Sequence, residues 1–159
     1  MLVTAKVRLV GSKGSYSSTA LADSGARMSL ADKSLAERIG VEYTGREINF
    51  VSVSGHTVKA SEAIVSELEL EGEVLKYEPI AVAEIPKLVK ETLLKNELDE
   101  NMLIGVLTLE RANVIPDTTT GKLRKVESFI LQVRSYASFS SLGSSIFSSV
   151  KLNISFPAP

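Results

Sequence analysis

The sequence predicts a mainly β fold with two or three short helices, and three observations support this prediction. Apolar and polar residues alternate near the N-terminus, and a second strand-like run covers 48–75, which is the pattern of half-buried strands. Glycine- and serine-rich segments separate the apolar runs, as expected for hairpin turns. Helical spacing of apolar residues is confined to short segments near 33–39, 86–98 and 106–112.

Composition narrows the classes of function. The chain has 159 residues, of which 44% are hydrophobic, and a net charge of −1, so a substantial core is expected and a nucleic-acid partner is not. It contains no cysteine, which excludes disulfides, thiol nucleophiles and cysteine-ligated metals. A single histidine, His56, excludes a metal cluster built from several histidines of one chain. We therefore expect no metal and no cofactor.

The chain shows no sign of membrane insertion. No apolar run reaches membrane-spanning length, and the N-terminus lacks the long apolar segment of a signal peptide. These observations predict a cytoplasmic protein without a membrane partner.

The first third of the chain predicts a hairpin followed by a helix. Alternation over 3–9 predicts a strand, and a second strand over 16–22 returns and ends at Asp23. Asp32 is a typical N-cap residue, and Gly40 is a typical C-terminal stop. They bound a predicted helix over 33–39.

The middle of the chain predicts a long hairpin and a second helix. Ser54-Gly55-His56 lies between two β-rich runs, which is a hairpin signal. The segment 71–73 predicts another turn, and 77–82 another strand. Pro86 suits the first turn of a helix, and we interpret its apolar stripe, which continues to Leu98, as core packing.

The last third predicts short elements and a tail. A strand over 102–105, a helix over 106–112, a hairpin tip over 116–121 and a strand over 129–133 follow one another. From Ser135 to Ser149, serines interleave with apolar residues and no residue is charged. We predict a folded domain over 1–134 and a serine-rich, loosely ordered tail over 135–159.

The most informative segment is Ala20-Leu21-Ala22-Asp23-Ser24-Gly25-Ala26, whose Asp-Ser-Gly sequence occurs only once. An apolar run leads a carboxylate into a turn of small residues, where the backbone packs closely around it. On its own, such a turn favours an ordinary Asx turn or cap.

Two motifs in the same order change that interpretation. Leu21 to Ser29, followed by a helix through Ala36-Glu37-Arg38, resembles the catalytic turn of retropepsin-like aspartic proteases. Leu103-Ile104-Gly105, followed by Leu107 to Glu110, is similar to the second motif of that family. The resemblance extends over about 3–126 and is strongest to the retroviral-protease-like domain of DNA-damage-inducible shuttle proteins. It implies a closed β-barrel that forms one half of an acid protease.

The resemblance also implies roles for particular residues. Asp23 corresponds to the catalytic carboxylate. Ser24, Gly25 and Ala26 complete the active-site turn, with the Ser24 hydroxyl bonded across the pair of turns. The implied flap and substrate-binding residues are Ser52, Val53, Ser54, Gly55, His56, Ile104 and Gly105.

One catalytic turn per chain implies a homodimer, because acid-protease chemistry needs two carboxylates that share one proton. The expected activity is aspartic endopeptidase cleavage of a peptide or unfolded protein by an Asp-activated water. Two alternatives stay open at this point: a non-catalytic dimeric module that binds peptides in the same cleft, and a dimerisation module with a vestigial cleft.

Overall fold

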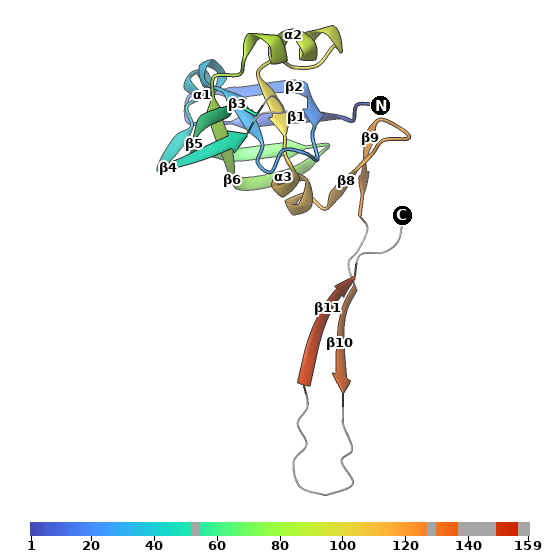
Figure 1. Ribbon diagram of the computed structural model, residues 1–159. Coiled ribbons are helices and arrows are strands. Elements are labelled where there is room, and N and C mark those ends of the chain that lie inside the picture. The colour runs from blue at the N-terminus through green and yellow to red at the C-terminus, as the bar shows by residue number, and fades with distance from the viewer. Residues whose placement is uncertain (52–54, 127–129, 137–148, 156–159) are drawn as a thin grey trace, which may run out of the picture. The chain divides into compact units, whose positions relative to one another are not determined.

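The computed structural model describes residues 1–51, 55–126, 130–136 and 149–155 (Figure 1). It divides into two units, Met1–Lys125 and Val126–Pro159, which are described separately. The strands of the first unit are β1 (Thr4–Val10), β2 (Ser15–Ala22), β3 (Leu30–Asp32), β4 (Glu42–Val51), β5 (Thr57–Leu70), β6 (Glu73–Ala83), β7 (Met102–Ile104), β8 (Val114–Asp117) and β9 (Lys122–Lys125). Its helices are α1 (Lys33–Ile39), α2 (Lys87–Lys95) and α3 (Val106–Arg111).

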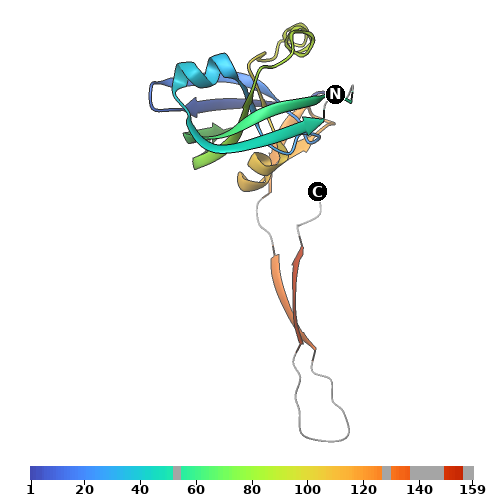
Figure 2. The same ribbon diagram turned by 60° about the vertical axis from the view of Figure 1, so that its left-hand side comes forward.

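The sheet of the first unit closes into a barrel, as predicted. Its strand order is β4-β5-β6-β3-β7-β2-β1-β9-β8, and β1 also pairs with β5. The strands β1, β2, β7, β3, β6 and β5 therefore form a ring. Outside the ring, β4 pairs with β5 in a long antiparallel hairpin, whose two strands run side by side in Figure 2.

The barrel forms because its strands have one apolar face. In β1, the side chains of Ala5, Val7 and Leu9 are buried, while those of Lys6 and Arg8 are exposed. The alternation seen in the sequence is thus the alternation of inward and outward side chains. The largest fully buried side chains of the unit are Leu9, Leu35, Ile39, Leu68, Leu70, Ile80, Met102, Ile104, Val65 and Thr108.

Helix α1 begins and ends where the sequence predicts. The Asp32 carboxylate accepts a hydrogen bond from the Ser34 amide at 3.1 Å, so Asp32 is the N-cap. Gly40 follows the helix with a φ of +75°, a conformation that favours glycine.

Helix α2 differs from its prediction. Only Leu93 is buried within it, whereas the Leu88 side chain is 75% exposed and that of Leu94 is 54% exposed. Its attachment is partly ionic, since the Lys90 ammonium lies 3.0 Å from Oδ1 of Asp32. The interpretation of the stripe as core packing therefore holds for Leu93 and Leu98, which are buried, and is wrong for Leu88 and Leu94.

The second unit contains β10 (Ile130–Tyr136) and β11 (Ser149–Ser155), which pair antiparallel in the register Ile130↔Ser155 to Tyr136↔Ser149. The domain boundary at residue 134 stays a prediction. In the described part of the chain, no helix is long and apolar enough to cross a membrane.

Candidate active site

Asp23 lies directly after β2, where β7 fixes its main chain. The two strands run parallel, with Leu21 opposite Leu103 and Ala22 opposite Ile104. The Asp23 amide continues this ladder by donating to the Ile104 carbonyl at 2.8 Å. The position of Asp23 is therefore set by a strand that is distant in sequence.

The turn after Asp23 holds its carboxylate. Oδ1 accepts a hydrogen bond from the Gly25 amide at 2.8 Å, and the Ala26 amide donates to the Asp23 carbonyl at 3.2 Å. A Cβ at Gly25 would lie 3.1 Å from that same Oδ1, so a small residue suits this close contact. Asp23 is half-buried and Ser24 is exposed, and among the described residues the Ser24 hydroxyl has no hydrogen-bond partner.

The second predicted motif lies against the first. A Cβ at Gly105 would stand 2.3 Å from the Met28 carbonyl carbon and 2.8 Å from the Ala26 carbonyl oxygen, so only glycine fits this crossing of backbones. The amides of Val106 and Leu107 donate to the Ala26 and Arg27 carbonyls at 2.8 and 3.0 Å. The first turn of α3 therefore uses its free N–H groups to bind the Asp23 turn.

The predicted flap corresponds to the hairpin of β4 and β5. Val51 and Thr57 are its last paired residues. Gly55 and His56 are exposed, and Gly55 has a φ of +80°. The predicted flap residues Ser52, Val53 and Ser54 lie outside the described residues.

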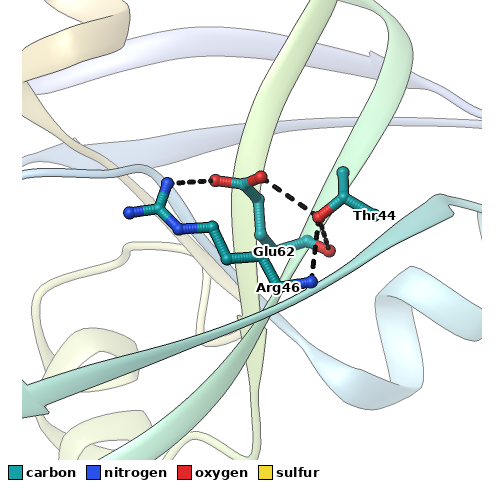
Figure 3. Close-up of polar contacts among 3 residues, drawn as sticks. All are labelled: Thr44, Arg46 and Glu62. Carbon is teal, nitrogen blue, oxygen red and sulfur yellow. Dashed lines mark hydrogen bonds and ion pairs between the residues drawn. The ribbon is translucent and has the colours of Figure 1, made fainter.

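A polar cluster fixes the base of this hairpin (Figure 3). The register of β4 shifts between Tyr43 and Glu47. Across the shift, the Glu62 carboxylate on β5 accepts hydrogen bonds from the Thr44 hydroxyl and from Nη1 of Arg46, both at 3.1 Å. The irregular part of β4 is thus tied to its neighbour, while the far end of the hairpin is exposed.

Apolar side chains connect the turn with the hairpin arms. They form a small cluster separate from the barrel core. It consists of buried Ala60, Ala81 and Ala83 with partly buried Met28, Leu30, Ile48, Phe50 and Val58. This cluster offers an apolar surface beside the Asp23 turn.

One surface cavity lies between α1 and the β4–β5 hairpin. It has a volume of about 760 Å³ and is bounded by α1, the β4–β5 hairpin and the end of β6, including Lys33, Tyr43, Lys59 and Glu84. Asp23 does not line this cavity. In the described part of the chain, no three His, Asp or Glu side chains are grouped to hold a metal.

Comparison with known proteins identifies the family. The chain matches the aspartyl protease family over residues 5–108. It belongs to that family. A comparison with curated protein sequences gives no match.

Solved structures resemble the fold. The retroviral protease-like domain of Ddi1 from Leishmania major is 18% identical, with a TM-score of 0.50, and the alignment covers 80% of this chain and 91% of that one. The EIAV protease complexed with the inhibitor HBY-793 is 20% identical, with a TM-score of 0.46 and coverage of 70% and 88%. A retropepsin-like aspartic protease from Rickettsia conorii is 18% identical, with a TM-score of 0.44 and coverage of 70% and 78%.

Sequence reasoning missed the polar side chains beneath the Asp23 turn. Ser29, Glu78 and Thr108 are buried and hydrogen-bonded to one another and to Gly105. Two of them, Ser29 and Thr108, belong to the two segments that carry the family resemblance, which is the only signal the sequence offered. Glu78 has no such signal.

Proposed function

We propose that the chain is a homodimeric aspartic endopeptidase that cleaves extended peptides or unfolded protein segments with an Asp-activated water. One observation carries the proposal. In a chain of the aspartyl protease family, the Asp23 carboxylate sits in a turn held by the Gly25 amide and by the β7 strand. The Asp23 carboxylate is half-buried, and in the described residues no cation forms an ion pair with it.

A second copy of the chain would complete the site. The shared-proton chemistry needs two carboxylates, because like charges about 3 Å apart cannot both ionise. A two-fold axis beside Asp23 would supply the second carboxylate from the same turn of the partner. The Ser24 hydroxyl is exposed and has no hydrogen-bond partner among the described residues, which supports this arrangement, since it is available for a bond between the two turns.

The reaction then follows from the two protonation states. The ionised Asp23 takes a proton from a water molecule, whose oxygen adds to the scissile carbonyl carbon. The protonated Asp23 of the other subunit donates its proton to the carbonyl oxygen. The tetrahedral intermediate collapses as one of its hydroxyl groups returns a proton to the second Asp23, the C–N bond breaks, and the amine leaves with the proton that the first Asp23 took from water. Water attacks directly, so no acyl-enzyme forms.

The hairpin of β4 and β5 would act as a flap over an extended substrate. A peptide can add its backbone to such a structure as a further strand. The flap residues in this proposal are Ser52, Val53, Ser54, Gly55 and His56, and the apolar cluster beside the turn would receive apolar substrate side chains. Ile104 and Gly105 would support the floor of the cleft.

The test uses Asp23→Asn with Asp117→Asn as its matched control. Asp117 lies at the end of β8, beside the turn to β9, and accepts a hydrogen bond from the Thr119 amide at 2.9 Å. Its replacement should therefore leave cleavage nearly unchanged. We expect wild type to sediment as a dimer and to cleave denatured casein, and Asp23→Asn to remain a folded dimer without cleavage. Casein binding by a wild-type dimer that never cleaves it would instead establish the non-catalytic module. A strict monomer at micromolar concentration would overturn the peptidase proposal.

A further inference from the structure

A buried carboxylate lies beneath the catalytic turn. Glu78 on β6 is only 3% exposed. Its Oε1 accepts a hydrogen bond from the Thr108 hydroxyl at 2.9 Å, and its Oε2 forms an ion pair with Nη1 of Arg111. Nη2 of Arg111 donates to the Lys76 carbonyl at 2.7 Å. Helix α3 is thereby tied to β6 at two points.

The carboxylate sets the direction of a chain of hydrogen bonds. An ionised carboxylate only accepts, so Thr108 gives Glu78 its single hydroxyl hydrogen. The Ser29 hydroxyl, 2.7 Å from the Thr108 hydroxyl, must then donate to Thr108. Its own oxygen accepts from the Gly105 amide at 3.1 Å. The relay thus runs from Gly105 through Ser29 and Thr108 to Glu78, with every proton pointing toward the charge.

The first member of this relay, the Gly105 N–H, belongs to the peptide group that holds Asp23. The Gly105 N–H and the Ile104 carbonyl are parts of one planar unit. The N–H is fixed by Ser29, and the carbonyl accepts the Asp23 amide at 2.8 Å. Hydrogen bonds in such a chain polarise one another, so the relay both orients this peptide plane and strengthens its bond to Asp23.

The backbone of β6 is deformed at the residue before Glu78. Tyr77 is 73% exposed and has a φ of +54°, a conformation that costs a non-glycine residue free energy. In β6, Leu75 points inward and Lys76 outward, Tyr77 is again outward, and Glu78 is buried. The left-handed residue shifts the alternation by one position, and this shift turns the Glu78 side chain into the interior. A strained residue that re-aims a neighbour beside a candidate site is typical of a functional constraint.

We propose that Glu78, Thr108 and Ser29 are positioning residues that fix the Asp23 turn through the Ile104–Gly105 peptide. The proposal rests on the proposed function, because the turn that they position is the proposed catalytic one. A buried ion pair is a poor way to gain stability, since well-packed apolar residues often serve equally well. The ion pair and the strain at Tyr77 therefore need a reason other than stability. Keeping Asp23 in the geometry that catalysis needs supplies that reason.

The experiment compares Thr108→Val, Thr108→Ser and Thr92→Val. Valine keeps the volume of threonine but removes the hydroxyl, whereas serine keeps the hydroxyl. Thr92→Val makes the same chemical change on α2, where the Thr92 hydroxyl donates to the Leu88 carbonyl at 2.8 Å in an exposed helix. All three are assayed with denatured casein well below their unfolding temperatures, and the amide hydrogen exchange of Asp23, Gly105 and Leu68 is followed by NMR.

We expect Thr108→Val to lower kcat by about tenfold or more, with KM little changed. The upper limit is roughly hundredfold, which is the cost of a misplacement of about 1 Å. Its Asp23 and Gly105 amides should exchange about tenfold faster relative to the core amide of Leu68, because only the relay is broken. Thr108→Ser should restore both quantities to within about twofold, and Thr92→Val should match wild type. A purely structural role would lower the unfolding temperature of Thr108→Val without lowering its kcat below that of Thr108→Ser.

Two results would overturn the proposal: a kcat of Thr108→Val equal to that of Thr92→Val, or Asp23 and Gly105 amides that change only in step with Leu68. If no variant, including wild type, cleaves casein while the exchange effect is selective, the proposed function fails and the positioning role stands. Should Thr108→Val not fold, Ser29→Ala breaks the same relay one bond closer to Gly105 and carries the same expectations.

Discussion

Replacing Asp32 with asparagine removes a buried charge that joins three parts of the first unit. The Asp32 residue is 6% exposed. Its Oδ2 accepts hydrogen bonds from the Ser34 amide and hydroxyl at 3.1 and 2.6 Å. Its Oδ1 accepts the Ile85 amide and lies 3.0 Å from the Lys90 ammonium. One carboxylate therefore caps α1 and anchors both the entry to α2 and α2 itself.

The magnitude follows from the pKa of this carboxyl. Burial alone would raise the pKa, but the hydrogen bonds from Ser34, Ile85 and Lys90 outweigh it and lower the pKa from 3.8 to about 2. At about 1.4 kcal/mol for each pH unit, the ionised carboxylate contributes on the order of 2 kcal/mol to the free energy of unfolding. Because the folded-state pKa is depressed, this contribution is present above the unfolded-state value and is lost as the pH falls through the folded-state value.

The assay is urea unfolding of wild type and Asp32→Asn between about pH 6 and about pH 2, where the linkage operates. We expect the difference in unfolding free energy to shrink by about 2 kcal/mol over this range. Glu91→Gln is the control, since the Glu91 carboxylate pairs with Lys87 at 3.8 Å on an exposed face of α2, and such pairs contribute about 1 kcal/mol or less. A difference between wild type and Asp32→Asn that stays constant with pH would refute this account of Asp32.

Three further substitutions test other parts of the structure. Gly105→Ala should destabilise the fold by about 1–3 kcal/mol and impair cleavage, because its Cβ would meet the Met28 backbone at 2.3 Å; wild-type stability in urea unfolding would contradict this packing. Tyr77→Gly should raise the unfolding free energy by up to about 1 kcal/mol, since glycine relieves the left-handed strain and the lost side chain is 73% exposed; a clear loss of stability would show that Tyr77 is not strained. Gly55→Val should weaken casein cleavage while sedimentation still shows a dimer, because a β-branched residue disfavours the φ of +80° at Gly55; full activity would argue against the flap.

Local signals predicted the elements that depend on local interactions. Asp32 and Gly40 marked the limits of α1 because capping uses the residues adjacent to the helix. The hairpin tip predicted over 116–121 lies at 118–121, since Pro116 and Asp117 still belong to β8, and β8 and β9 pair across it. The two family motifs were recognised as separate segments, and the structure brings Gly105 against Met28.

Features that depend on distant segments were not predictable in this way. The short strand β3 was missed, because its three residues form a strand only by pairing with β6 and β7. The burial of Glu78 was missed for a different reason: regular alternation from Leu75 places Tyr77 inside and Glu78 outside, and only the backbone conformation of Tyr77 reverses this order. The apolar stripe of α2 suggested core packing, but the helix lies against the barrel through Leu93 and the Lys90 ion pair.

The place of β7 in the sheet has a consequence for biosynthesis. This strand is inserted between β2 and β3, the two strands that flank the Asp23 turn, yet Ser29 and Gly105 are 76 residues apart in the chain. A nascent polypeptide that has emerged only as far as α2 has the Asp-Ser-Gly sequence but no strand to order it. Under the proposed function, the chain stays inert on the ribosome until nearly all of its barrel has been translated, which would protect neighbouring unfolded chains, and the nascent chain itself, from premature cleavage.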